Sequence, residues 1–262
     1  MTEADAQLAA IKTQARAIYG ELASTPTGVI HIASAVRPSG QLHVIKIQAG
    51  APPSSTDSFV LHFWRAHYDA ILTTGQILRA EPTLSYGLSA GLTRYRQQVL
   101  GKSGNVRCAI LSRGLQLSAE HPVFRETRGI ELVVLTPPQN VAELRKVLAD
   151  RAEVVGLPQL DARAALDFLQ RTGSTTIGVE AGPSVARTLY GVDPRVEHLM
   201  LSICEAELPP DGVGGALPED AELFAGMRRI SEVVCEEESG RWRFQHWQTV
   251  ESLLRPAGFQ NG

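Results

Sequence analysis

The sequence predicts an α/β domain with a mostly parallel central sheet and an antiparallel hairpin at its carboxyl end. Short apolar stretches typical of buried strands alternate with amphipathic stretches of helical period over most of the chain. Two further strand-like stretches, residues 232–237 and 242–247, flank a Glu-Ser-Gly-Arg turn, which indicates a hairpin. A length of 262 residues is enough to bury one large core.

The elements follow in order along the chain. Residues 4–23 carry apolar side chains at three- and four-residue spacing, which predicts an amphipathic helix. We therefore expect an N-terminal helical extension over residues 1–27 and a single domain over residues 28–262. The expected strands are residues 29–33, 43–47, 70–73, 107–112, 131–136, 151–157, 175–180 and 199–203. The expected helices of this domain are residues 58–67, 141–149, 161–171 and 184–190.

Two connections in this series carry specific expectations. A Pro-Ser-Gly turn separates the first two strands, so we expect them to pair as a hairpin. Residues 209–218 are rich in glycine and proline, and we expect a mobile loop there.

Composition argues against several classes of protein. The net charge is -3 and no stretch is strongly basic, so nucleic acid is not an expected partner. Three cysteines far apart give neither a disulfide framework nor a zinc motif. His62 and His67 lie five residues apart and do not share a helix face, so we interpret them as surface or packing residues and expect no metal. The acidic start and the lack of an ~18-residue apolar run favour a cytoplasmic protein without a membrane span.

One turn has the features of a phosphate site. An apolar strand runs into Ala181, Gly182, Pro183 and Ser184, and a helix is expected to begin there. Small residues and free N–H groups at a helix start suit a diphosphate. A tight strand-to-helix turn without a ligand explains the same residues equally well, because the stretch is neither a GxGxxG motif nor a P-loop.

A second stretch, residues 63–84, combines a helix with Arg65, the strand residues Asp-Ala-Ile-Leu, a Thr-Thr-Gly turn and a Glu-Pro-Thr-Leu loop. It resembles the corresponding segment of riboflavin-biosynthesis reductases, which reads Arg, Asp-Ala-Ile-Leu, a small-residue turn and Ala-Asp-x-Pro-Ser/Thr-Leu. Residues 177–189 are similar to the Glu-Gly-Gly-x-x-Leu element of that family. Residues 197–203 resemble the strand that follows it.

The resemblance implies a dihydrofolate-reductase-like three-layer fold, NADPH as the hydride donor and a homodimer. It implies reduction of a pyrimidine ribosylamino compound, of the 5-amino-6-(5-phosphoribosylamino)uracil type, or of a related small heterocycle. By the same resemblance, Glu180 and Glu81 are the candidate catalytic acids, and Arg65, Leu84 and Glu180 face the substrate. The implied cofactor-binding residues are Ala33, Thr74, Gly75, Ile77, Glu81, Ser112, Arg113, Gly182, Pro183, Ser184, Val185 and Thr188.

The chain also departs from the family pattern. The acid expected after the first strand is missing, and Gly87 stands where the family has an arginine beyond Leu84; Arg94 or Arg96 is a candidate to replace it. These departures favour two alternatives: a catalytically silent relative that serves as a nucleotide-binding or assembly module, or a substrate other than the phosphorylated pyrimidine. A plain α/β binding protein without a dinucleotide is a third reading.

Overall fold

The computed structural model describes residues 2–20, 26–46, 51–126 and 129–254. Its helices are α1 (Glu3–Tyr19), α2 (Ser55–His67), α3 (Gly75–Ala80), α4 (Ala90–Gln98), α5 (Pro122–Arg125), α6 (Val141–Leu148), α7 (Ala162–Arg171), α8 (Pro183–Ala186), α9 (Asp220–Leu223) and α10 (Val250–Leu254). Its strands are β1 (Gly28–Val36), β2 (His43–Ile45), β3 (Ala70–Thr74), β4 (Val106–Leu111), β5 (Ile130–Thr136), β6 (Glu153–Gly156), β7 (Thr176–Val179), β8 (His198–Cys204), β9 (Val213–Ala216), β10 (Met227–Glu237) and β11 (Gly240–Thr249).

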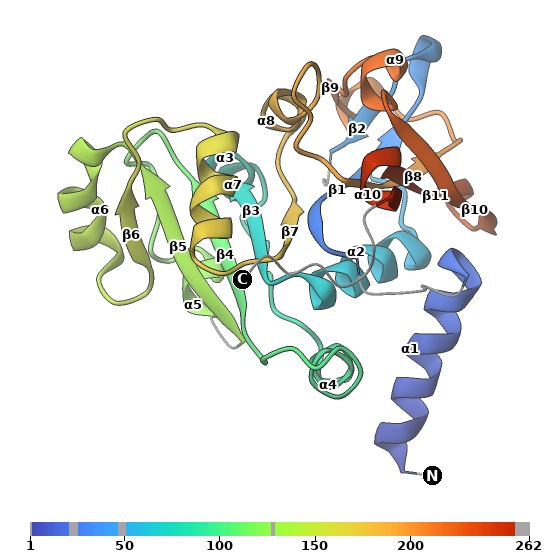
Figure 1. Ribbon diagram of the computed structural model, residues 1–262, viewed down its shortest axis with the longest axis horizontal. Helices are drawn as coiled ribbons and strands as arrows, with labels where there is room; N and C mark the ends of the chain where they lie inside the picture. Colours follow the sequence, from blue (N-terminus) through green and yellow to red (C-terminus); the bar gives the residue numbers. More distant parts are fainter. Residues whose placement is uncertain (1, 21–25, 47–50, 127–128, 255–262) are drawn as a thin grey trace.

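One continuous sheet organises the molecule (Figure 1). Its order is β10-β11-β8-β1-β7-β3-β4-β5-β6, and the strands from β8 to β6 run parallel to their neighbours. The terminal strands β10 and β11 form an antiparallel hairpin that pairs with β8. The predicted fold class, a mostly parallel sheet with a C-terminal antiparallel hairpin, is confirmed.

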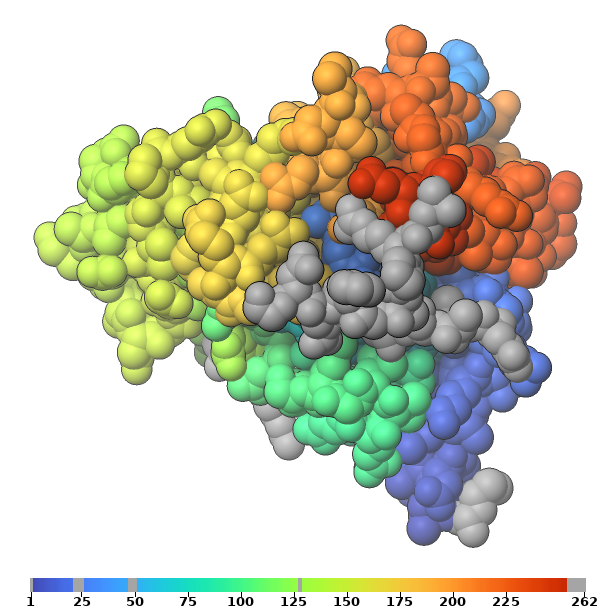
Figure 2. Space-filling model, in the orientation of Figure 1, coloured from blue at the N-terminus to red at the C-terminus, as the bar shows by residue number. Residues whose placement is uncertain are grey.

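Two hydrophobic clusters cover the two faces of this sheet, because successive strand side chains point to opposite faces. In β1, Ile30 and Val36 join the cluster that packs under α1, α2 and α4, whereas Val29 and Ala35 join the cluster under α7. Figure 1 shows α7 crossing one face of the sheet, and Figure 2 shows α1 lying against α4 on the outside of the molecule. The result is the three-layer arrangement that the strand and helix order predicts.

The sheet branches along β1. Its first residues, Gly28 to His31, pair with β7, whereas Ala35 and Val36 pair antiparallel with β2. The predicted hairpin between these two strands is therefore confirmed. Strand β2 in turn pairs with β9. Because β7 ends at Val179 while β1 continues, the carboxyl end of β7 lies at the branch, where parallel sheets place their ligands.

Three sequence-based boundaries are corrected by the structure. The segment 209–218 is not an irregular loop: it contains a short 3-10 helix, Pro210–Gly212, and strand β9. The first helix ends at Tyr19 because Gly20 has a φ of 70° and its N–H caps the last turn; residues 21–23 of the predicted helix lie outside the described part. The predicted helix over 184–190 divides into α8 and a 3-10 turn, Arg187–Leu189.

No helix of the described ranges is long and apolar enough to cross a membrane. His67 packs among Phe63, Trp64 and Tyr95 as a core residue. His62 is half-buried and forms a hydrogen bond with the carbonyl oxygen of Ser58 in its own helix.

Four buried histidines make the fold sensitive to acid. Burial lowers the pKa of His31, His67 and His198 from 6.5 to about 4 and the pKa of His246 to about 3. Between pH 6.5 and 4 these four histidines therefore bind more protons in the unfolded chain than in the folded chain. The free energy of unfolding of the protein is expected to fall as the pH is lowered from 6.5 to 4, by up to about 1.4 kcal/mol per pH unit for each histidine.

Urea unfolding at a series of pH values measures this loss. The variant His67→Gln is expected to show a weaker dependence of the free energy of unfolding on pH, because one titrating group is removed. A free energy of unfolding that stays constant from pH 7 to pH 4.5 would contradict the prediction.

Candidate functional site

The predicted site residues gather along the carboxyl edge of four neighbouring strands. The N–H of Glu180, directly after β7, donates to the carbonyl of Leu72 in β3 at 2.9 Å. Gly75, directly after β3, lies so close to Ser112, directly after β4, that a Cβ at Gly75 would be 3.0 Å from the serine hydroxyl. Ala33 in β1 lies two residues beyond the last pair with β7. Segments from four separate parts of the chain thus form one continuous edge.

The strongest interaction at this edge is a buried ion pair. Arg65 of α2 donates from Nη2 to Glu180 at 2.6 Å and from Nε to both carboxylate oxygens at 2.9 and 3.1 Å. The two side chains are only 4% and 9% exposed. Planar, multidentate contacts of this kind are the strong form of an arginine–carboxylate pair. Burial opposes the charge of the guanidinium, but the Glu180 carboxylate outweighs it and raises the pKa of Arg65.

Arg65 has further partners that the sequence did not indicate. Its Nη1 donates to the carbonyl of Ser85 at 3.3 Å, and its guanidinium carbon lies 4.6 Å from the centroid of the Tyr86 ring. Tyr86 is buried and donates its hydroxyl to Thr73 at 2.7 Å. Residues 85 and 86 belong to the loop after Leu84, so these two contacts of Arg65 hold the loop against α2. No local sequence signal marks Tyr86 as a partner of Arg65.

Glu81 lies within the electrostatic reach of the same pair. Its backbone N–H caps α3 by donating to Ile77, and its side chain is half-buried. Burial raises the pKa of Glu81, the Arg65 charge opposes that rise and the Glu180 charge adds to it. A carboxyl group with a raised pKa retains its proton to higher pH and is suited to proton transfer. The structure therefore brings together Arg65, Glu180 and Glu81.

Thr74, Gly75 and Ile77 form the start of α3. The Thr74 hydroxyl caps this helix by accepting from the N–H of Ile77 at 3.3 Å. Thr74 and Gly75 are buried, and Ile77 and Leu84 are half-buried. Thr74, Gly75 and Ile77 therefore lie at the carboxyl end of β3, where α3 begins.

The turn after β7 has the open geometry that a phosphate needs. Gly182 has a φ of −59° and no atom within 4 Å of the position of a Cβ, so the space in front of it is free. Pro183 follows at the first helical position, and Ser184 is exposed. Val185 is half-buried, and its carbonyl accepts from the Thr188 hydroxyl at 2.8 Å. The side of Pro183 is covered by β9, since a Cβ at Gly215 would lie 2.8 Å from its ring.

The end of β4 is less open than the sequence suggested. Ser112 is buried, and its hydroxyl donates to the carbonyl of Gly114 at 3.0 Å. Arg113 is exposed, and its carbonyl accepts from the Asn140 side chain at 3.0 Å. The serine hydroxyl is thus engaged in its own turn, while the arginine side chain is in solvent.

The two arginines considered as replacements at Gly87 lie elsewhere. Arg96 is buried at the opposite end of the sheet, where it donates to the carbonyls of Ala66, Tyr68, Ser103 and Asn105. Arg94 reaches the side chain of Gln7 on α1 at 3.5 Å. The suggestion that either reaches the site is wrong, because both side chains hold α4 against its neighbours.

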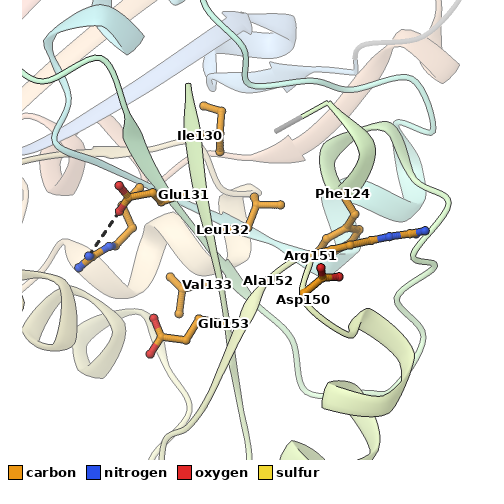
Figure 3. Close-up of a pocket in the computed structure, with 10 residues that line it drawn as sticks. Phe124, Ile130, Glu131, Leu132, Val133, Asp150, Arg151, Ala152 and Glu153 are labelled. Atoms are coloured by element: carbon orange, nitrogen blue, oxygen red, sulfur yellow. Dashed lines mark ion pairs between the residues drawn. The ribbon is translucent and has the colours of Figure 1, made fainter. Parts of the chain in front are cut away.

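A hollow of about 520 Å³ lies away from this edge (Figure 3). Its walls come from the amino ends of β4, β5 and β6, and it contains the ion pair of Arg107 with Glu131 at 3.6 Å. Ligands of open parallel sheets bind outside the carboxyl ends of the strands. We therefore place the candidate site at the carboxyl edge and not in this hollow. In the ranges that the structure describes, no group of three or more metal-binding side chains is found.

The fold and the site define a class of protein, a three-layer α/β domain with a mostly parallel sheet and a candidate site at the branch of that sheet. A model of the RibD C-terminal domain matches residues 5–192. The chain belongs to the RibD C-terminal domain family. A search of curated proteins finds no match.

Solved structures agree with this fold. A pyrimidine reductase-like protein of Corynebacterium diphtheriae is 20% identical, with a TM-score of 0.64 over 90% of this chain and 98% of its own. The riboflavin biosynthesis reductase Rib7 of Saccharomyces cerevisiae is 12% identical, with a TM-score of 0.58 and the same coverage. A bifunctional deaminase and 5-amino-6-(5-phosphoribosylamino)uracil reductase of Thermotoga maritima is 16% identical, with a TM-score of 0.58, and this chain covers 56% of it.

Proposed function

We propose that this protein is an NADPH-dependent reductase of the riboflavin-biosynthesis type, acting on a pyrimidine ribosylamino compound or a related small heterocycle. The family match carries the proposal, because residues 5–192 include every segment that contributes to the candidate site. The test is titration of the protein with NADPH, followed by fluorescence, and then measurement of NADPH oxidation with the pyrimidine substrate.

The residues present fit a dinucleotide. The open space at Gly182 would admit the diphosphate, and Ala33, Ile77 and Glu81 would lie along the nicotinamide half. NADPH supplies the hydride when bound; the protein orients and polarises the reactants. Correct placement can supply up to about 7–11 kcal/mol of the barrier reduction. Glu81 would hold a proton near the substrate, since its pKa is raised by burial.

A silent relative is the second candidate function. The observation that favours it is the Arg65–Glu180 pair, because both groups expected to face the substrate are engaged with each other. NADPH binding without turnover of any pyrimidine substrate would support a nucleotide-binding or assembly module. Turnover at ordinary enzyme rates, about 1–10³ per second, would exclude it.

We also propose that the reductase prefers a substrate without a phosphate group. Arg65 is neutralised by Glu180, and Arg94 and Arg96 are held elsewhere. Without a charge-assisted contact, worth about 1.5–3 kcal/mol, the phosphate contributes no binding energy, so the dephosphorylated pyrimidine is expected to have a kcat/KM at least equal to that of its phosphorylated form.

Gly87→Arg provides the matched variant. A Cβ at Gly87 would meet only the Ser85 hydroxyl, at 3.6 Å, so the loop can accept a side chain there. The variant is expected to improve turnover of the phosphorylated form selectively. Efficient turnover of the phosphorylated form by the unaltered enzyme would refute the proposal.

A homodimer is a further proposal, and the edge of the sheet supports it. Strand β10 is an edge strand of 11 residues with Ile230 and Val234 exposed, whereas the opposite edge, β6, has only 4 residues. Long exposed edges of this kind favour pairing with another strand.

A further inference from the structure

Arg79 occupies a position at the carboxyl edge that the sequence did not indicate. It lies in α3, four residues after Gly75, so the two share one face of the helix. Side chains on a helix lean toward its amino end. Consistent with this, Nη1 of Arg79 lies 3.4 Å from the position of a Cβ at Gly75. The guanidinium therefore folds back over the junction of β3 and α3.

The residues after β4 also border the space beside Gly75. A Cβ at Gly75 would lie 3.0 Å from the Ser112 hydroxyl and 3.2 Å from Leu117. Arg79 thus lies beside Ser112 and Leu117, next to the turn whose Ser112 and Arg113 are implied by the family resemblance to bind the cofactor. Within the described part of the chain, its guanidinium has no carboxylate partner in an ion pair, in contrast to Arg65. Arg79 is a solvent-exposed cation available to an anion.

The position suits the 2′-phosphate of the cofactor. Strand β3 lies between β7, which carries the open turn at Gly182, and β4. Neighbouring strands are about 4.8 Å apart. A group at the end of β3 or β4 is therefore roughly 5–10 Å from the proposed diphosphate position, within the reach of one ribose. The 2′-phosphate is attached to the ribose that carries the diphosphate, so its binding site must lie at this distance.

We propose that Arg79 is the principal cation for the 2′-phosphate of NADPH, which it approaches across Gly75. The inference rests on the proposed dinucleotide-binding function. An arginine is suited to this task because its planar guanidinium donates two hydrogen bonds to a phosphate. Ser112 contributes less, since its buried hydroxyl is engaged with Gly114. Arg113 is exposed on the adjacent segment, and its guanidinium is not among the three atoms nearest to a Cβ at Gly75, whereas that of Arg79 is.

The experiment compares the dissociation constants of NADPH and NADH for the unaltered protein, Arg79→Ala and Arg113→Ala. Arg79→Ala is expected to raise the dissociation constant of NADPH about tenfold or more and to leave that of NADH unchanged. The preference for NADPH over NADH therefore narrows. Arg113→Ala is the matched control at a neighbouring exposed arginine and is expected to change the preference less than threefold. Arg79→Lys is expected to retain part of the preference, since the charge is kept and the two-pronged contact is lost.

The outcomes separate the inference from the proposed function. A preference that survives Arg79→Ala, or one that is lost in Arg113→Ala alone, overturns the role of Arg79. Equal affinity of the unaltered protein for NADPH and NADH also overturns it, while leaving dinucleotide binding intact. If the unaltered protein binds neither nucleotide, the proposed function itself fails. Unchanged NADH affinity in Arg79→Ala shows that the variant is folded.

Discussion

Replacing Gly182 by valine is expected to abolish NADPH binding while leaving the fold intact. The valine side chain would fill the space in front of the turn that the diphosphate needs, and the lost charge-assisted contacts would weaken binding more than about a hundredfold. The fold should tolerate the change because the φ of −59° is normal for valine and a Cβ at this position meets no atom within 4 Å. Fluorescence titration with NADPH measures the loss, and thermal unfolding checks the fold.

Ala90→Val is a suitable control, since it adds bulk at the exposed start of another helix, α4. It should bind NADPH as the unaltered protein does. If Gly182→Val keeps its full affinity for NADPH, the diphosphate is bound elsewhere and residues 182–188 form only a structural turn.

The second large effect is expected from the Arg65–Glu180 pair. Glu180→Gln or Arg65→Met leaves one buried charge without its partner, which should lower the free energy of unfolding by about 3–5 kcal/mol. Replacing both residues by apolar ones should cost less than the two single changes together, because no uncompensated charge remains. Urea unfolding of the two single variants and the double variant measures the coupling.

Lys146→Met is the control, since Lys146 forms an ion pair with Glu143 in which the side chains are 76% and 52% exposed. Such a pair contributes about 0–1 kcal/mol. Single variants of Arg65 or Glu180 that are as stable as Lys146→Met would show that the pair is open to solvent and available to a ligand.

Much of the fold could be predicted from local patterns. Buried strands such as β4 and β5 contain the apolar runs Cys-Ala-Ile-Leu and Leu-Val-Val-Leu, and Asp161 caps α7 at the place that its sequence indicates. Strand β9 was missed because Val-Gly-Gly-Ala has the composition of a turn. It forms because glycine permits close approach to β2: a Cβ at Gly214 would lie 2.5 Å from the Val44 side chain and 2.9 Å from its carbonyl oxygen.

The sequence by itself determined the fold class, the family resemblance and the segments that make up the candidate site. Those signals are local: strand and helix periods, caps and short motifs depend on residues that are near one another in the chain. The tertiary structure alone decided which of these residues touch. Arg65 and Glu180 lie 115 positions apart and both were expected to face a substrate, yet they bind each other. Arg79, to which the sequence analysis assigned no role, lies beside Gly75 and Ser112. Such contacts depend on the order of the strands in the sheet, which places α2, α3 and the ends of β7 and β4 side by side and which no short-range pattern specifies.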